Sequence, residues 1–256
     1  MFNTKHEIRR APYCLPLAVL CLLSCLPARA AIALVSHAYC FDSGDSGSCT
    51  TSTINTTGAT LLTVVIEGYN ATGTVSDHYA NSWNYLTTQS VSGVGHLTIA
   101  YAYGPAVGAS ETFTCSVVYA GCKASAWSGT LTTSSVYDTQ NGASSSSATS
   151  LATGSITPAQ TGELILSGWG TRNNSGQGGT AAVTASLTIL DCATVSTGDA
   201  DCDAYLVDSN SSGINPTWSW NSAAEDFEVA IAGFKPSGAA PPTCGQSIAL
   251  MGVGCR

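Results

Sequence analysis

The segment Gly44-Asp45-Ser46-Gly47 has the residue types of a serine nucleophile held in a glycine-rich turn. A serine hydroxyl becomes a strong nucleophile only when a histidine base, oriented by an acid, lies within hydrogen-bond reach. After residue 30, His37 is the only histidine before Ser46, and no histidine follows His96. We therefore predict a polar turn here and no catalytic residues.

Asp199, Asp201 and Asp203 alternate along the chain, so an extended backbone would place the three carboxylates on one face. Carboxylate oxygens are the ligands that Ca²⁺ prefers. Ala204 stands where a D-x-D-x-D-G loop needs glycine, and no glutamate closes the site. A weak Ca²⁺ site and a solvated acidic loop both stay open, and no other cofactor is expected.

Three tryptophans are the candidate ligand-binding residues. Trp218 and Trp220 share one strand face, where two flat rings can either stack on a sugar or pack in a core. Trp169 lies between Gly168 and Gly170, and we expect it to be exposed at the mouth of a loop.

Of the 11 cysteines, three lie before residue 30 and the other eight fall in close neighbours. None of these spacings is the C-x₂₋₄-C spacing of a zinc site. An even number of cysteines behind a secretion signal indicates disulfides. The predicted bridges, each closing a short loop, are Cys40–Cys49, Cys115–Cys122, Cys192–Cys202 and Cys244–Cys255.

Residues 1–30 have the pattern of a signal peptide, with a basic start, an apolar run over 14–26 and a small-residue site at 28–30. Cleavage before Ala31 would give a secreted, extracellular, periplasmic or cell-surface protein. Lipidation at Cys25 is the alternative. The apolar run is too short to span a membrane.

Behind this leader only four basic residues remain, against all but one of the chain's 16 carboxylates. A chain with so few cations has no basic patch for nucleic acid or for anionic lipid. The acidic surface suits solubility.

Hydrophobic alternation predicts strands and little helix. Leu97–Tyr103 and Phe113–Tyr119 alternate on either side of a Gly-Pro turn, which predicts a β-hairpin. Thr60–Glu67 is apolar on both faces, as in a strand covered on each side. Ser134–Gly154 is rich in serine and threonine, and is expected to cross between two sheets. The later predicted strands are Leu164–Trp169, Val183–Leu190, Ala204–Asp208, Thr217–Trp220 and Asp226–Phe234.

A faint echo links two of these segments: Gly58 and Leu61-Leu62 resemble Gly162 and Leu164-Ile165 about a hundred residues later. The predicted fold is an all-β, two-sheet antiparallel sandwich of about eleven strands over residues 31–235, jelly-roll-like, with disulfide-pinned loops. A Pro/Gly linker and a cysteine-closed tail follow over 236–256.

Residues 31–237 resemble a widespread jelly-roll or concanavalin-like accessory module of secreted bacterial proteins. The resemblance rests on TLLTVVIEGYN, VSDHYANSWNYLT, TGSITPAQTGELILSGWG and NPTWSWNSAAEDFEVAIAGFKP. Ala80 stands where the turn of such modules usually has glycine. The resemblance implies a β-sandwich, and it brings no catalytic residues and no settled ligand.

Three function classes follow. The first is a non-catalytic module that binds a glycan or another cell-surface or extracellular polymer. The second is a self-associating structural subunit of a surface layer, filament or adhesin. The third, a hydrolase, has the least support, because no acid/base or nucleophile constellation is present.

Overall fold

The computed structural model describes residues 31–42, 44, 46–172, 179–194 and 199–238. The described residues up to Ser237 form one compact unit. The predicted leader over 1–30 and the fourth predicted bridge, Cys244–Cys255, lie outside the described residues. Within the described part, no helix has the length and hydropathy needed to cross a bilayer.

The predicted all-β class is confirmed. The described chain contains strands and one short 3₁₀ helix, η1 (Ser134–Val136). The strands form four antiparallel sheets, two large and two small. Seventeen strands in four sheets replace the predicted eleven or so in two.

The first half of the chain forms a large and a small sheet. The first large sheet has the order β1-β9-β3-β7-β5, with β6 also paired to β7, and the first small sheet has the order β2-β8-β4. The strands are β1 (Ala33–Phe41), β2 (Cys49–Thr50), β3 (Leu61–Tyr69), β4 (Thr74–Asp77), β5 (Asn84–Tyr85), β6 (Gln89–Ser90), β7 (Gly95–Tyr103), β8 (Phe113–Ser116) and β9 (Gly121–Ser128).

The second half repeats this arrangement. The second large sheet has the order β10-β17-β12-β15-β14, and the second small sheet has the order β11-β16-β13. The strands are β10 (Tyr137–Ala148), β11 (Ser150–Ala152), β12 (Leu164–Thr171), β13 (Ala181–Val183), β14 (Thr188–Thr194), β15 (Ala200–Val207), β16 (Thr217–Trp220) and β17 (Glu225–Phe234).

The two halves share one connectivity. In each large sheet the first strand of the half pairs with the last, and the last pairs with the strand that opens at Leu61 or Leu164. Each small sheet likewise joins the second, penultimate and fourth strands of its half, when β5 and β6 are counted as one interrupted strand. The described residues therefore form two halves of the same connectivity, each with one large and one small sheet, rather than a single two-sheet sandwich.

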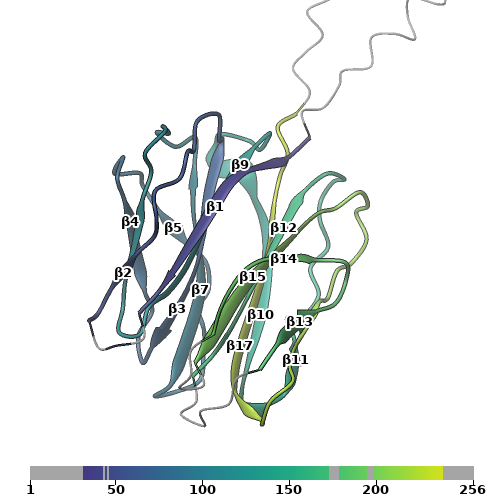
Figure 1. The fold of residues 1–256 in the computed structure, drawn as a ribbon. Coiled ribbons are helices and arrows are strands. Elements are labelled where there is room, and N and C mark those ends of the chain that lie inside the picture. The colour runs from purple at the N-terminus through teal and green to yellow at the C-terminus, as the bar shows by residue number, and fades with distance from the viewer. Residues whose placement is uncertain (1–30, 43, 45, 173–178, 195–198, 239–256) are drawn as a thin grey trace, which may run out of the picture. The chain divides into compact units, whose positions relative to one another are not determined.

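Within this unit the sheets stack in four layers, with the two large sheets in the middle (Figure 1). Apolar side chains fill the space between each large sheet and its small sheet, and also part of the space between the large sheets. β3 and β12 lie at the centres of the large sheets, and their residues are buried on both faces apart from exposed Tyr69. This explains why both segments are apolar without alternation.

Across the middle interface, β1 contacts β14 while β6 contacts β10, and β9 contacts β15 while β7 contacts β17. By position in their sheets, β1 corresponds to β10, β6 to β14, β7 to β15 and β9 to β17. Corresponding strands therefore make corresponding contacts, as in a two-fold arrangement. The echo between Gly58/Leu61 and Gly162/Leu164 marks this duplication. Both glycines have positive φ, at +87° and +83°, and both leucines begin the equivalent central strands.

The predicted hairpin over residues 97–119 is wrong. β7 pairs with β3, β5 and β6, whereas β8 pairs with β2 and β4 in the small sheet. The connection over 104–112 crosses between the two sheets of the first half. Alternation predicts each strand correctly, but it carries no information about which neighbour the strand pairs with.

Ser134–Gly154 does pass between two sheets, but mostly as strand rather than as a connection, because β10 belongs to the second large sheet and β11 to the second small sheet. β10 pairs only with β17, so it is an edge strand of the second large sheet among the described residues. None of its side chains is fully buried, which explains how a serine-rich segment can form a strand.

Candidate functional site

Charged side chains gather between the two large sheets, at the end where β3 and β12 finish. We call this cluster the ionic layer: Glu67, Lys123, Arg172, Asp199, Asp201, Asp203, Asp226 and Glu228. All except Asp199 are at most 5% exposed. Carboxylates outnumber the two cations, so the layer cannot be neutral unless some carboxyls hold protons.

Lys123 and Asp201 join the two large sheets at the centre of the layer. Lys123 lies opposite Val65 on the inward face of the first sheet, and its Nζ contacts Asp201 Oδ1 from β15. Both side chains are 0% exposed. The rings of Tyr39 and Phe41 lie 5.9 and 6.0 Å from the ammonium, which adds a favourable cation–π contact.

Arg172 follows β12 and connects several loops. Its Nε lies 3.4 Å from Glu67 Oε1, and its Nη1 lies 3.6 Å from Asp199 Oδ2. Its Nη2 donates to the backbone carbonyl of Tyr119. Its own backbone N–H donates to Asp226 Oδ2 at 3.0 Å. Tyr119 has a φ of 54°, and Arg172 helps to hold this left-handed backbone in place.

Glu67 and Glu228 each lie against a glycine of the opposite sheet. A Cβ atom at Gly170 would come within 2.5 Å of Glu67 Oε2, and one at Gly95 within 2.5 Å of Glu228 Oε1. A larger residue at either position would push against the end of a buried glutamate side chain, which would have to shift. Among the described residues, the Oε2 atoms of both glutamates lack a hydrogen-bond partner.

Burial raises the pKa of several of these carboxyls. The pKa of Glu228 is raised by burial first, and then by repulsion from Glu67 and Asp226. Burial also raises the pKa of Glu67, although Arg172 opposes the shift. The pKa of Asp203 rises to about 7 through burial and its neighbour Asp191, and that of Asp226 rises to about 7 through burial. These groups hold protons at a pH where exposed carboxyls are ionised.

A histidine–carboxylate pair borders the ionic layer. His37 Nδ1 lies 2.7 Å from Asp191 Oδ2, and the backbone N–H of Asp191 donates to Asp203 Oδ1 at 2.9 Å. Ser46 is bonded elsewhere, since its Oγ donates to the carbonyl of Ser48 at 3.0 Å. The His37–Asp191 pair therefore has no hydroxyl nucleophile bonded to it among the described residues.

The acidic triplet proposed for Ca²⁺ is divided between different partners. Asp201 pairs with Lys123, Asp203 accepts the N–H of Asp191, and Asp199 lies near Arg172. Within the described chain, these carboxylates form no group whose oxygens are close enough to share an ion. The Ca²⁺ site stays a prediction, and in this structure the three aspartates contact protein groups instead.

The expected exposure of Trp169 is wrong. Trp169 and Trp218 are 0% exposed, and Trp220 is 3% exposed. The Trp169 ring stacks on Trp218 with centroids 6.1 Å apart, and lies 5.0 Å from Trp220. Its flanking glycines point to the ionic-layer side, while Trp169 itself points into the core beneath the second small sheet. The three rings thus offer no exposed surface to a sugar in this structure.

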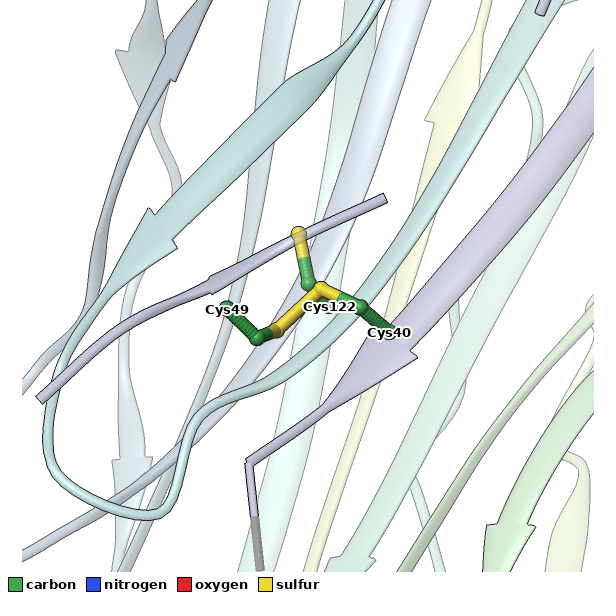
Figure 2. A group of neighbouring side chains, drawn as sticks. All are labelled: Cys40, Cys49 and Cys122. Atoms are coloured by element: carbon green, nitrogen blue, oxygen red, sulfur yellow. A yellow bond between two sulfur atoms is a disulfide. The ribbon is translucent and has the colours of Figure 1, made fainter. Parts of the chain in front are cut away.

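Three of the four predicted disulfides are confirmed: Cys40–Cys49, Cys115–Cys122 and Cys192–Cys202. The first two lie together between the first large and small sheets. The sulfur atoms of Cys40, Cys49 and Cys122 lie within 4.8 Å of one another (Figure 2). Metal binding requires thiolates, so sulfurs held in these bridges are not available as ligands.

An open pocket lies on the outer side of the second half. Its lining comes from the β13–β14 turn and from β15 with the loop that follows it: Ala185, Ser186, Leu206, Asp208, Ser209, Asn210, Ser212 and Ile214. Its volume is about 280 Å³, which is small for a ligand site. Asp208 is 6% exposed, and its Oδ2 atom has no hydrogen-bond partner among the described residues.

The turn at the rim of the pocket is unusual. Ala185 and Ser186 both have positive φ, at 61° and 60°, although neither is glycine or asparagine. Such a conformation costs about 1–2 kcal/mol per residue. Consecutive strained residues beside a pocket are a common mark of a functional region.

Sequence reasoning missed both the ionic layer and the pocket. One signal for the layer was present: Lys123 and Arg172 are two of only four basic residues behind the leader, and both adjoin apolar strand-like segments. A cation in such a setting must be paired when it is buried. The pocket depends on how two distant loops meet, which no local pattern records.

Comparisons with family models, with curated proteins and with solved structures give no match for this chain. The resemblance to a bacterial accessory module therefore stays a hypothesis.

Proposed function

We propose that this protein is a secreted, non-catalytic module that binds an extracellular glycan or a similar polymer, and that the pocket beside Asp208 is its binding site. The observation that carries the proposal is the composition of this pocket. Leu206 and Ile214 supply an aliphatic floor, and the side chains around it are a carboxylate, a carboxamide and three serine hydroxyls.

Sugars have the complementary chemistry. A sugar ring presents C–H groups on its faces and hydroxyl groups, which both donate and accept, around its edge. Asp208 already accepts the N–H of Asn210 at 3.0 Å through Oδ1, while Oδ2 has no hydrogen-bond partner within the described part of the chain. A buried acceptor without a partner costs about 1–3 kcal/mol, and a bound hydroxyl or water would relieve this cost. The volume suits one sugar unit of a longer chain.

Secretion is part of the same proposal. The three disulfides fit an oxidising compartment, and the first 30 residues have the pattern of a signal peptide. The acidic, cation-poor composition argues against nucleic acid as the partner.

A glycan array probed with the purified mature protein tests the proposal. Asn210→Ala and Ser212→Ala change exposed pocket side chains and should each weaken binding at least fivefold without changing the unfolding transition. Asn215→Ala is the matched control, because Asn215 is exposed on the same loop but is not part of the pocket lining. Binding that is equally strong in all three variants would exclude this pocket, and an array without signal would exclude the glycan proposal.

Assembly is the second candidate function, and β1 is the observation that favours it. β1 is an edge strand among the described strands, and it carries Val35 and Tyr39 at 37% and 48% exposure. Unpaired edges with exposed apolar side chains invite pairing with another chain. Light scattering on wild type and on Val35→Lys tests this candidate: a wild-type oligomer lost in the variant would support it.

A hydrolase is the third and least supported candidate. The carboxylates of the ionic layer are buried where a substrate would first have to separate the two large sheets.

A further inference from the structure

Four cysteines of the first half occupy the corners of a compact cluster. In the large sheet, Cys40 of β1 lies directly opposite Cys122 of β9. In the small sheet, Cys49 of β2 lies directly opposite Cys115 of β8. The disulfides run the other way and link the two sheets, as Cys40–Cys49 and Cys115–Cys122. The ladder register therefore offers the same four cysteines a second pairing, within each sheet.

The distances favour exchange between the two bridges. The sulfurs of Cys40, Cys49 and Cys122 all lie within 4.8 Å of one another (Figure 2). Thiol–disulfide exchange proceeds when a thiolate attacks a neighbouring disulfide sulfur. A thiolate released at Cys40 or Cys49 would already lie within 4.8 Å of the Cys122 sulfur.

The second half shows that the alternative pairing fits this fold. Cys192 and Cys202 are direct ladder partners on β14 and β15, and they form a disulfide. Opposed cysteines on neighbouring strands of a large sheet are thus bridged in this same protein. Cys40 and Cys122 have the same relationship on β1 and β9.

Accessibility sets the order of attack. Cys40 and Cys49 are half-buried, and β2 is an edge strand of its sheet. Cys115 and Cys122 are 0% exposed. A thiol from solution would therefore reach the Cys40–Cys49 bridge first, and the buried bridge would react only through the sulfur released there.

We propose that this cluster is a thiol-triggered exchange site that converts the two cross-sheet disulfides into two within-sheet disulfides. A small thiolate attacks the Cys49 sulfur, forms a mixed disulfide and releases the Cys40 thiolate. Cys40 then attacks the Cys122 sulfur, which forms Cys40–Cys122 and releases the Cys115 thiolate. Cys115 attacks the mixed disulfide at Cys49, which forms Cys49–Cys115 and returns the small thiolate.

The sequence is balanced, because three disulfide bonds form, three break, and the initiating thiolate is regenerated. No net oxidation or reduction occurs. The product loses both covalent links between the first large and small sheets. The trigger is chemically defined as a low-molecular-weight thiol, or an oxidoreductase that presents a reactive thiolate.

The test uses the full chain with 2-mercaptoethanol at a tenth of the protein concentration, an acid quench, and peptic mapping of the disulfides. We expect cross-linked peptides that contain Cys40–Cys122 and Cys49–Cys115, with no rise in total thiol and with Cys192–Cys202 unchanged. A map that shows only the original bridges after prolonged incubation would overturn the proposal, as would new links from the cluster to Cys244 or Cys255.

A second measurement needs no added thiol. Cys115→Ser leaves a thiol at Cys122, beside the Cys40–Cys49 bridge, and the free thiol should spread over Cys122, Cys40 and Cys49 at equilibrium. The matched control is Cys192→Ser, in which the thiol should stay on Cys202. Cys49→Ser, which leaves the Cys40 thiol beside Cys115–Cys122, serves if Cys115→Ser does not fold. A thiol confined to its original residue in the folded cluster variants would contradict the exchange.

Discussion

At one end of the interface between the large sheets, Leu61, Leu164 and Phe234 pack in an apolar core. At the other end, a few residues further along the same strands, the ionic layer takes its place. The apolar end is stabilised by area removed from water, and this contribution does not depend on pH. The ionic layer depends on which of its carboxyls carry charge. The contribution of the interface to stability is therefore expected to be independent of pH at its apolar end and to change with pH at the ionic layer.

The largest effect should come from removing the central cation of the ionic layer. Lys123→Met leaves Asp201 buried without its partner, and we expect a loss of about 4 kcal/mol in the free energy of unfolding at pH 7. Urea denaturation measures this. Asp201→Leu added to Lys123→Met should recover most of the loss, because two apolar groups replace a buried pair at little cost. A double variant as unstable as the single one would contradict the ion-pair explanation.

The apolar end should give a somewhat smaller loss. Leu164→Ala removes a side chain that is 0% exposed, and the cavity should cost about 3 kcal/mol. The loss should be equal at pH 5 and pH 8, since no titratable group of the ionic layer belongs to this core. A pH-dependent loss would show that the two ends are coupled, and that the apolar end does not stabilise the interface independently of the ionic layer.

Glycines at the middle of the interface test how closely the sheets approach. A Cβ at Gly168 would come within 2.6 Å of Val65 Cγ1, so Gly168→Ala should cost about 2 kcal/mol through overpacking. Val65→Ala in the same chain should recover at least half of that loss. If the double variant loses more free energy of unfolding than the two single variants lose together, steric contact between these two residues does not explain the loss in Gly168→Ala.

The stability of the ionic layer should also depend on pH. The folded pKa values of Asp203 and Asp226, about 7, lie above 3.8, the ordinary pKa of an aspartate side chain. The folded state then binds more protons than the unfolded state between these limits. Stability should therefore fall as the pH rises from about 4 to about 7. The raised pKa values of Glu67 and Glu228 extend this fall to higher pH.

Glu228→Gln tests this slope, because the amide cannot ionise and the Glu228 carboxylate is repelled by both Glu67 and Asp226. Denaturation curves at pH 5, 7 and 9 should show a flatter slope than wild type, and greater stability than wild type at pH 9. Leu164→Ala is the control, with a slope parallel to that of wild type. A wild-type protein more stable at pH 9 than at pH 5 would exclude buried neutral carboxyls.

Local patterns were enough for many of the strands, although not for the serine-rich β10, and for three disulfides whose partners lie close in sequence. The apolar faces of Leu61–Tyr69 and Leu164–Thr171 also marked the centres of two sheets. Pairing was beyond such patterns, because strand alternation describes a residue's face and not its neighbour. Trp169 shows the same limit: its flanking glycines indicated an open loop, whereas they make room for side chains of the opposite sheet.

The ionic layer was beyond sequence reasoning for a similar reason. Lys123 and Asp201 are far apart in the chain, and each is surrounded by apolar neighbours of its own strand. Only the stacking of two sheets makes them partners. The pocket beside Asp208 likewise depends on two loops, one of which owes its position to the unusual backbone of Ala185 and Ser186.

The two halves also fit each other through corresponding residues of their central strands. In ladder register Val65 corresponds to Gly168, and Glu67 to Gly170. These corresponding residues meet across the interface, each large side chain against a missing one. Two copies of the first half would oppose valine to valine and glutamate to glutamate, and two copies of the second half would leave empty space. Each half therefore fits the other half and fits a copy of itself poorly, so two molecules should not associate through like halves.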